Sequence, residues 1–431
     1  MRSLIWFRND LRVTDNAALN AAVKASSEVV PVFIFDPQFW EEDRWGQVKT
    51  GAFRTQFLLE SLADLKADLE DMGGTLLIRK GEPAEVLGAL AEDLGARTVF
   101  ATAEHTQQEV EREAQVGQRL DLRLEEQMTM YHPDDLPFEL EQLPDVFTRF
   151  RGKMEKRADV RDPLPEPEAL VLPDGLEGDA VPSMVDLGVE PRIPDARGVL
   201  PFKGGAKAAW ARLDHYFWET KKLRVYKKTR NGLLGADYSS KFSPWLALGC
   251  ISPREIHAQV REFEGEIEKN EDTYWLLFEL IWRDYFRYVA MRYGNRIFHK
   301  RGIKNESPKW RTDRRTFEAW CEGRTQCDFV NANMRELAAT GFMSNRGRQN
   351  VASYLVHDLG VDWRMGASWF EHMLLDHDPA SNYGNWIYVA GVGNDPRPNR
   401  KFNTSGQAER YDADGKYRRH WSHATLELDL Q

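Results

Sequence analysis

The chain has 431 residues, of which 42% are hydrophobic and 29% charged, so it can bury extensive cores and is not disordered throughout. It contains no run of about 18 apolar residues, which argues against a membrane-spanning segment. An apolar stretch at 4–7 follows the first residue almost at once, and three cysteines are too few for a disulfide framework. We therefore expect a monomeric protein of the reducing cytoplasm, without a signal peptide and with two or three domains.

Charge divides the chain into two unlike halves. Residues 1–200 carry 22 Lys+Arg against 39 Asp+Glu, a net of −17, whereas residues 201–431 carry 36 against 29, a net of +7. Eleven of the 14 tryptophans also follow residue 200. A basic half rich in aromatic residues is typical of a protein that meets a polyanion such as a nucleic acid, although a large helical core would also collect tryptophans.

The first 130 residues alternate between strand and helix signals. Short apolar runs predict strands at 4–7, 29–35, 75–78 and 99–101, with helices between them at 57–72 and 83–94. This alternation predicts a parallel sheet with helices on both faces, a fold that binds ligands at the carboxyl ends of its strands. Neither a G-x-G-x-x-G sequence nor a P-loop is present, so we expect no standard dinucleotide or nucleoside triphosphate site.

Two further parts follow this α/β domain, which we assign to residues 1–130. Prolines crowd residues 162–167 and recur up to Pro201, so the stretch 131–202 is expected to lack long helices and to connect two domains. Helical periodicity dominates after residue 203, up to about residue 375. We therefore expect a helical domain over residues 203–431.

Residues 238–246 combine three serines and a lysine with the start of an apolar run. Hydroxyls and free backbone N–H groups at a helix start form a site for an anion such as phosphate, and Tyr226 and Arg230 could reach the same anion. Taken alone, the segment favours the alternative of ordinary helix capping by serine.

Residues 278–287 form a predicted helix on which Glu279, Trp282 and Arg283 share one face, because they are spaced i, i+3, i+4. A glutamate beside a tryptophan on a mostly apolar helix is either a surface group or a carboxyl group with a raised pKa in a cavity. The sequence alone leaves both alternatives open.

Polar residues also gather on one face of the predicted helix after Gly341. Asn345, Arg348 and Gln349 lie on that face and could contact a carboxylate, a phosphate or a base edge, or could form the polar side of an ordinary helix.

Two aspartates stand close together at the start of residues 376–386. Asp376 and Asp378 have no His or Cys at metal spacing, so hydrogen bonding to a ribose or a flavin pyrimidine edge is the better interpretation, and we expect no metal. The intervening His377 is expected to face solvent and is given no role.

Five long stretches together resemble the photolyase/cryptochrome family: 202–213, 238–253, 279–286, 333–354 and 376–397. They occur in the family's order, and the resemblance covers essentially the whole chain, although it is weakest between residues 105 and 200. Within the family, residues 333–350 resemble the DASH cryptochromes most closely. The resemblance implies a Rossmann-like α/β domain followed by an all-α, FAD-binding catalytic domain.

The resemblance also implies the binding site of FAD, held in a U shape within the helical domain. The residues that would hold its phosphates are Tyr226, Ser239, Ser240, Lys241, Phe242 and Ser243. Those that would surround its ring system and ribose are Arg283, Asn345, Arg348, Asp376, Asp378 and Asn382. The amide of Asn382 would face flavin N5.

Catalytic roles follow from the same resemblance. Glu279 would hydrogen-bond a carbonyl of a flipped pyrimidine dimer, in a pocket walled by Trp282 and Tyr388. The tryptophans that match the family's electron-transfer chain from the surface to the flavin are Trp310, Trp363 and Trp386. Enzymes that repair the (6-4) lesion place histidines where this chain has Asn345 and Gln349, so we do not expect that activity.

The expected function is light-driven repair of cyclobutane pyrimidine dimers, with single-stranded or damaged DNA as partner. The alternatives are a blue-light photoreceptor that signals through a partner and a passive flavin-dependent nucleic-acid binder. Beside Gln349, the residues expected to contact DNA are Arg230, Arg346, Arg397, Arg400 and Lys401. Methenyltetrahydrofolate is the expected antenna, with Glu111 as a contact in the N-terminal domain.

Three departures from the family's pattern bear on local geometry. Gln326-Cys327-Asp328 replaces a common Gly-x-Pro turn, Asn331 replaces a usual Asp, and Ile387 stands where Gln is frequent. They concern the loop before residue 333 and the shape of the dimer pocket, and they leave the expected flavin contacts in place.

Overall fold

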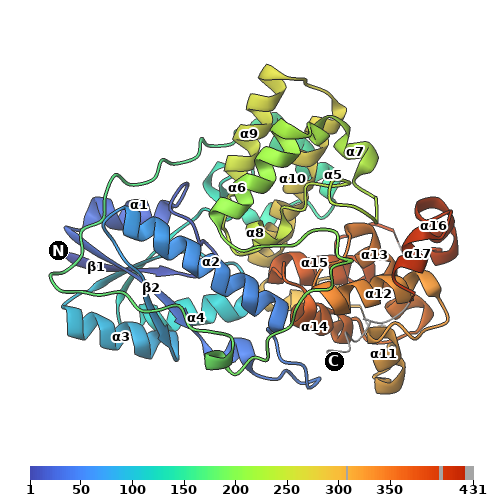
Figure 1. Ribbon diagram of the computed structural model, residues 1–431, viewed down its shortest axis with the longest axis horizontal. Helices are drawn as coiled ribbons and strands as arrows, with labels where there is room; N and C mark the ends of the chain where they lie inside the picture. The colour runs from blue at the N-terminus through green and yellow to red at the C-terminus, as the bar shows by residue number, and fades with distance from the viewer. Residues whose placement is uncertain (307–308, 398–400, 423–431) are drawn as a thin grey trace, which may run out of the picture.

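The computed structural model describes residues 1–306, 309–397 and 401–422. Figure 1 shows an α/β domain at the N-terminal end packed against a larger body of helices, with the segment between them running over the surface. None of the described helices is long and apolar enough to cross a membrane. The predicted combination of an α/β domain and an all-α domain is confirmed.

The N-terminal sheet has five parallel strands in the order β3-β2-β1-β4-β5. The strands are β1 Arg2–Phe7, β2 Glu28–Phe35, β3 Leu77–Lys80, β4 Thr98–Thr102 and β5 Asp121–Glu125. Strand β1 pairs with β2 on one side and β4 on the other, so Leu4 lies opposite both Val30 and Val99. Strand β5 escaped prediction because, at the sheet edge, none of its residues is buried and three of the five are charged.

Helices cover both faces of the sheet, because successive strand residues point to opposite sides. The helices of this domain are α1 Ala17–Ala25, α2 Ala52–Asp71, α3 Pro83–Leu94 and α4 Gln107–Gly117. Ile5 and Phe7 belong to a large core that also includes residues of α2 and of the helical body, whereas Leu4 and Trp6 pack with Leu87 of α3. The core of the molecule is therefore continuous from the α/β domain into the helical body.

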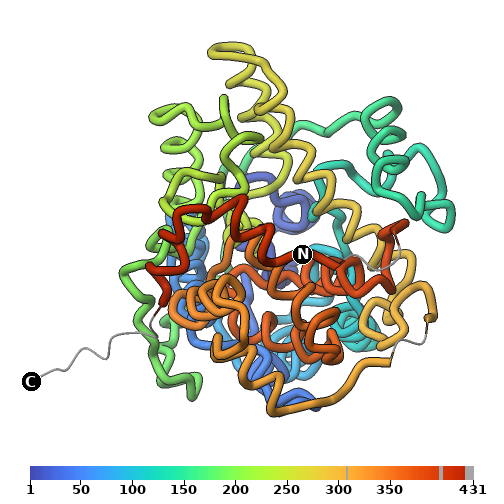
Figure 2. The backbone as a smooth tube through the Cα atoms, turned by 90° about the vertical axis from the view of Figure 1, so that its right-hand side faces the viewer, coloured from blue at the N-terminus to red at the C-terminus, as the bar shows by residue number. Residues whose placement is uncertain are grey.

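Residues 131–202 connect the two parts and run around two sides of the molecule (Figure 2). The expectation that this stretch holds no long helix is wrong, because α5 spans Phe147–Arg157. The helix is compatible with the sequence, since the prolines crowd in only from residue 163 onward. Phe147 fixes it to the helical body, where its ring stacks on Trp282 with centroids 3.6 Å apart.

The helical body is built around α10, which contacts α5, α7, α9 and α15. Asn270 begins α10 with a capping box, so a 23-residue helix starts at a defined point. The helices are α6 Ala206–Asp214, α7 Tyr226–Thr229, α8 Ser243–Ala247, α9 Pro253–Glu266, α10 Glu271–Tyr293, α11 Arg314–Cys321, α12 Asp328–Thr340, α13 Asn345–Ser353, α14 Trp363–Met373, α15 Pro379–Val389, α16 Thr404–Tyr411 and α17 Lys416–His420.

Buried polar contacts hold the two parts together. Arg254 of α9 forms a buried ion pair with Asp15, at 2.7 Å between Nη2 and Oδ1. The carboxylate of Asp284, in α10, accepts hydrogen bonds from the backbone N–H groups of Met130 and Tyr131. Because these groups are buried, the chain leaves the sheet in a fixed position against α10, next to the residues of the candidate site.

Candidate functional site

A cavity of about 520 Å³ lies within the helical body, between α7, α8, α10, α13 and α15; we call it the helical cavity. The residues that line it come from a stretch of more than 160 positions in the sequence. The predicted site residues that line it are Tyr226, Arg230, Ser239, Ser240, Lys241, Phe242, Ser243, Glu279, Trp282, Arg283, Asn345, Arg346, Arg348, Gln349, Asp376, Asp378, Asn382, Trp386 and Tyr388.

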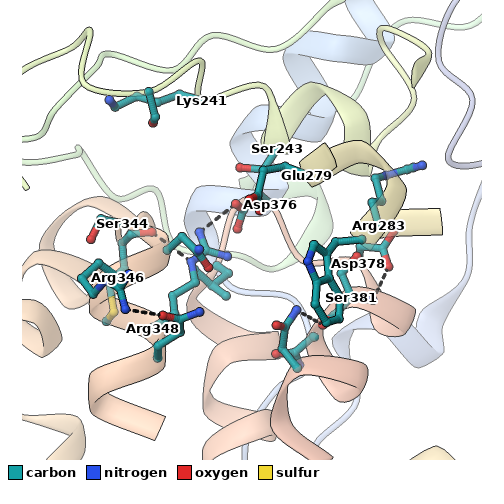
Figure 3. A pocket seen from close by; sticks show the side chains of 18 of the residues that line it. Lys241, Ser243, Glu279, Arg283, Ser344, Arg346, Arg348, Asp376, Asp378 and Ser381 are labelled. Carbon is teal, nitrogen blue, oxygen red and sulfur yellow. Dashed lines mark hydrogen bonds and ion pairs between the residues drawn. The ribbon is translucent and has the colours of Figure 1, made fainter. Parts of the chain in front are cut away.

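Arg348 and Asp376 form an ion pair at the wall of the helical cavity (Figure 3). Nη2 of Arg348 lies 2.7 Å from Oδ2 of Asp376, and its Nε donates to the carbonyl oxygen of Met343. The second oxygen of Asp376, Oδ1, is buried without a hydrogen-bond partner among the described residues. A buried acceptor without a partner is costly, so this oxygen is suited to a donor group on a ligand.

Asp378 is held from two sides at the start of α15. Its Oδ1 accepts the N–H of Ser381 as the helix N-cap, and its Oδ2 pairs with Arg287 of α10. Burial acts to raise the pKa of Asp378, but Arg287, Arg283 and the Ser381 N–H together outweigh it and hold the pKa below its usual value. The carboxylate therefore stays ionised and can accept a hydrogen bond inside the cavity.

Arg287, which pairs with Asp378, is a residue of the candidate site that the sequence reasoning missed. It lies i+4 from Arg283, so both guanidinium groups belong to one face of α10, and this spacing is the signal that could have found it. Arg283 donates to the carbonyl oxygens of Met128 and Leu246, and burial lowers its pKa to about 10. Arg283 therefore keeps its charge at neutral pH.

The serine-rich stretch lines the cavity just before α8, which has only five residues. Lys241 adopts a left-handed backbone conformation with φ of 58°, and its Nζ donates to the carbonyl oxygen of Ala236 at 2.7 Å. Figure 3 shows its side chain pointing away from the other labelled residues. Burial lowers the pKa of Lys241 to about 6, so any anion here meets hydroxyl and N–H donors from 239–243 rather than a lysine charge.

Glu279 lies in the wall of the helical cavity, which decides between its two alternative interpretations. Its side chain is 26% exposed and pairs with Arg230, whose Nη1 lies 2.5 Å from Oε1. Burial raises the pKa of Glu279 above its ordinary value, although Arg230 acts in the opposite direction. Beside it, the rings of Trp282 and Tyr388 meet edge to face with centroids 5.6 Å apart.

Trp386 is the predicted electron-chain tryptophan that reaches the helical cavity. Its benzene edge packs over Gly366 so closely that a Cβ at this glycine would lie 2.2 Å from Cη2. Its ring also contacts Trp320, with centroids 6.3 Å apart, and Phe370. Trp320 was not singled out from the sequence, because nothing local distinguishes it from other core tryptophans.

The other two predicted tryptophans do not line the helical cavity. Trp363 is fully buried at the start of α14, one turn before Gly366, and its Nε1 donates to the carbonyl oxygen of Lys300 at 3.2 Å. Trp310 is half-buried, and its own carbonyl oxygen accepts from Nζ of Lys300 at 3.4 Å. The neighbouring Arg311 pairs with Val361 as a β-bridge, which holds the segment of Trp310 next to the segment of Trp363.

Three predicted DNA contacts do not belong to the lining of the helical cavity. Arg397 pairs with Asp395, and Lys401 lies 2.6 Å from the carboxylate of Asp358. Arg400 lies outside the described residues.

A second cavity, of about 430 Å³, lies between the sheet and the helical body; we call it the interdomain cavity. It opens at the carboxyl ends of β1, β2 and β4, where a doubly wound sheet binds its ligands. Its lining includes Arg8, Asp36, Glu104 and the predicted antenna contact Glu111. Burial raises the pKa of Glu104 to about 7, so this carboxyl group titrates near neutral pH.

His377 lines both cavities, and the expectation that it faces solvent is wrong. It is 8% exposed, and its Nδ1 is buried without a partner among the described residues. Burial lowers its pKa well below the ordinary value, so the ring is neutral. Its place between two aspartates suggested a polar surface, but the turn into α15 carries it into the core.

The three departures lie away from the cavity lining. Ile387 is 1% exposed and packs in the core, and Cys327 is the N-cap residue of α12. The side chain of Asn331 closes the preceding loop by hydrogen bonds to the backbone and hydroxyl of Thr325. Over the described ranges, we find no group of three or more His, Cys, Asp and Glu residues arranged to hold a metal ion.

Known proteins resemble this chain over nearly its whole length. Residues 3–168 match the DNA photolyase family, and residues 275–429 match the FAD binding domain of DNA photolyase. A cryptochrome DASH of Gloeobacter violaceus is 50% identical over 97% of this chain and 85% of its own length.

Solved structures agree with this match. The cryptochrome of Synechocystis sp. superposes with a TM-score of 0.94 at 44% identity, covering 98% of this chain and 88% of that one. An archaeal photolyase of Sulfolobus tokodaii, whose structure is described with two FAD molecules, reaches a TM-score of 0.80 at 27% identity, covering 98% of this chain and 90% of that one. The chain therefore belongs to the photolyase/cryptochrome family, it is similar to the DASH cryptochromes, and its helical domain is an FAD-binding domain.

Proposed function

We propose that this protein repairs cyclobutane pyrimidine dimers in single-stranded DNA under blue light. The observation that carries the proposal is the position of Glu279: a carboxyl group with a raised pKa lies beside Trp282 and Tyr388, in the same cavity as the expected flavin contacts. A passive binder of flavin and nucleic acid would have no use for this arrangement.

The residues of the helical cavity fit FAD by their chemistry. The unpaired Oδ1 of Asp376 and the ionised Asp378 offer acceptors to N–H or O–H donors, and the stretch 239–243 offers donors to phosphate. Asn382 donates its amide hydrogen to the carbonyl oxygen of Ala367, which fixes the orientation of the amide at the cavity wall. Reduced FAD, when bound and excited, supplies the electron that splits the dimer.

The protein's own residues orient the lesion. Glu279 in its protonated form donates a hydrogen bond to a carbonyl oxygen of the dimer, and Arg230 holds the Glu279 side chain in place. Trp282 and Tyr388 present ring surfaces on which unstacked bases pack. Extrusion of the dimer into the cavity costs a few kcal/mol and least in a strand that is already unpaired, which supports the single-strand preference.

A Glu279→Gln variant tests this proposal. Repair should fall roughly tenfold or more, because a positioned proton donor contributes at least this much. Lesion affinity should fall about twofold or less, since the amide still donates a hydrogen bond worth about 1 kcal/mol. Glu262→Gln, an exposed glutamate of α9, serves as the matched control and should repair at the wild-type rate. Wild-type repair by Glu279→Gln would contradict the proposal and favour the photoreceptor alternative.

We further propose that the interdomain cavity binds an antenna chromophore, with methenyltetrahydrofolate as the expected ligand. The cavity offers aromatic walls from Trp6, Trp40 and Tyr383 and polar groups from Glu104 and Glu111. Aromatic walls with a few polar groups are typical of a site for a flat heterocycle. Some residues line both cavities, which supports a position of the chromophore beside the flavin.

A further inference from the structure

The positive charge of the C-terminal half is concentrated in one short segment. Residues 299–315 contain seven basic and two acidic residues, a net of +5, whereas all of residues 201–431 carry +7. None of the seven basic residues is among the predicted DNA contacts, and none lines the helical cavity. The positive charge of residues 299–315 therefore needs an explanation other than binding of a pyrimidine dimer.

The basic residues of this segment are presented to solvent. Arg301, Lys309 and Arg315 are exposed and form no hydrogen bond or ion pair with the described residues. The other members of this basic patch are Lys300, Lys304, Arg311 and Arg314. Lys300 pairs with Asp362 and Arg314 with Glu318. Arg311 and Lys304 are instead oriented by contacts that leave their charge uncompensated: Arg311 donates to the carbonyl oxygen of Leu359, and Lys304 to those of Gly391 and Asp395.

The basic patch surrounds Trp310. Lys309 and Arg311 flank it in sequence, and Nζ of Lys300 donates to its carbonyl oxygen. The β-bridge between Arg311 and Val361 ties this segment to the start of α14, where Trp363 is buried. Trp363 is followed one turn later by Gly366, on which Trp386 packs at the cavity wall. The outer end of the tryptophan series thus lies within the basic patch, between Lys309 and Arg311 in the sequence.

We propose that the basic patch is a docking surface for an acidic one-electron carrier protein that re-reduces Trp310. The inference rests on the proposed electron chain and names the class of its reductant. A patch with a net charge of +5 on a chain of net charge −10 steers an acidic partner to this place and repels it elsewhere. Transient redox complexes need only a small interface, which a segment of this length can supply.

The electron count of the step is simple. Trp310 has lost one electron inward along the chain, and the reduced carrier donates one electron to its indole. The indole returns to its neutral form, the carrier is oxidised by one electron, and no bond is formed or broken. Because Trp310 is half-buried within the patch, a docked carrier can reach it without entering the protein.

Nucleic acid is the other polyanion that such a patch could attract. Two observations favour the carrier: the outer tryptophan lies within the patch, and the residues that could face a lesion line the helical cavity instead. DNA binding at the patch therefore becomes an outcome of the test.

The test uses the flavin-loaded protein and an acidic plant-type [2Fe–2S] ferredoxin as probe. The charge-reversed double variant Arg301→Glu/Arg315→Glu is compared with Lys269→Glu, an exposed lysine before α10 that also has no partner among the described residues. We expect wild type and Lys269→Glu to bind the ferredoxin with an affinity that falls steeply with salt, and the double variant to bind at least about tenfold more weakly. Carbodiimide should cross-link the wild type to the probe through Lys309 or Lys300.

Photoreduction separates this inference from the electron chain itself. With neutral dithiothreitol as the reductant, the double variant should reduce its flavin at the wild-type rate, whereas with reduced ferredoxin it should be several times slower. Equal ferredoxin binding by wild type and double variant overturns the docking surface but leaves the chain intact. A third outcome is that the wild type does not bind ferredoxin and the double variant loses binding of oligothymidine. This outcome assigns the basic patch to nucleic acid and also overturns the docking surface for a carrier.

Discussion

The two cavities of this protein are similar in volume but are assembled in different ways. The helical cavity takes its lining from the helical body alone, whereas the interdomain cavity combines the carboxyl ends of three strands with residues of α2, α4, α14 and α15. They share Ala247, His377 and Asp378. A ligand in the first is held by one folding unit, while a ligand in the second depends on how two units pack together.

This difference teaches where each ligand's affinity comes from. In the helical cavity, charged groups such as Asp376 and Asp378 are already paired and buried, so the site is organised before a ligand enters. In the interdomain cavity, Glu111 is exposed and Glu104 has a pKa near neutrality. We therefore expect FAD to bind tightly, and the antenna chromophore to bind more weakly and with an affinity that depends on pH.

The largest expected effect is on FAD retention in an Asp376→Ala variant. The substitution removes the partner of Arg348 and the unpaired acceptor of the helical cavity, so most of the FAD should be lost during purification. The ratio of flavin to protein absorbance measures this, and Asp376→Asn should retain an intermediate amount. A full complement of FAD in Asp376→Ala would show that the cavity holds the flavin by other groups.

The next effect separates two tryptophans in ring contact. Trp386→Phe should keep its FAD but photoreduce at least tenfold more slowly, the factor that corresponds to a barrier about 1.4 kcal/mol higher. Trp320→Phe is the matched control, because Trp320 contacts the Trp386 ring but does not line the cavity, and it should photoreduce normally. The opposite ranking, measured with dithiothreitol as reductant, would assign the electron path to Trp320.

A smaller effect concerns the pH dependence of the free energy of unfolding, through Glu104 in the lining of the interdomain cavity. The folded-state pKa of Glu104, about 7, lies above the ordinary value of 4.5, so the folded protein binds this proton more tightly than the unfolded chain. Glu104 therefore stabilises the folded state at low pH, and this stabilisation is lost as the pH rises through 7. Urea unfolding should show that wild type, relative to Glu104→Gln, loses about 2–3 kcal/mol between about pH 5 and 8. Parallel pH profiles would mean that Glu104 is ionised in both states.

The smallest expected effect is that of Glu111→Ala on the antenna. Glu111 is exposed on α4, where it accepts a hydrogen bond from Gln107. If it also accepts one hydrogen bond from methenyltetrahydrofolate, its loss should weaken binding of the folate by about five- to tenfold. FAD content should not change. Titration with the folate measures the effect, and unchanged affinity would remove Glu111 from the site.

The same comparison explains what could be predicted from the sequence. Local motifs contain most of the helical cavity: the stretches 238–246, 278–287, 341–350 and 376–386 each supply several lining residues. Of the interdomain cavity, the sequence reasoning named only Glu111 and the shared Asp378, because its lining joins strand ends and loops of the sheet to residues of the helical body that are distant in sequence.

Individual misses have equally physical causes. Strand β5 has too little burial to show a hydrophobic pattern, and α5 was masked by the prolines that follow it. The pairing of Arg287 with Asp378 joins α10 to α15 and is visible only in three dimensions. His377 was misjudged because its neighbours are charged, although both are turned inward with it.

The most direct test of the central claim is repair itself. The photoreduced, FAD-loaded protein should restore thymine absorbance to a dimer-containing oligothymidine single strand under blue light. It should do so faster than for the same dimer in a duplex, and not at all in the dark. Failure to restore the single strand under light, with the flavin fully reduced and the lesion bound, would contradict the assignment of repair to the helical cavity.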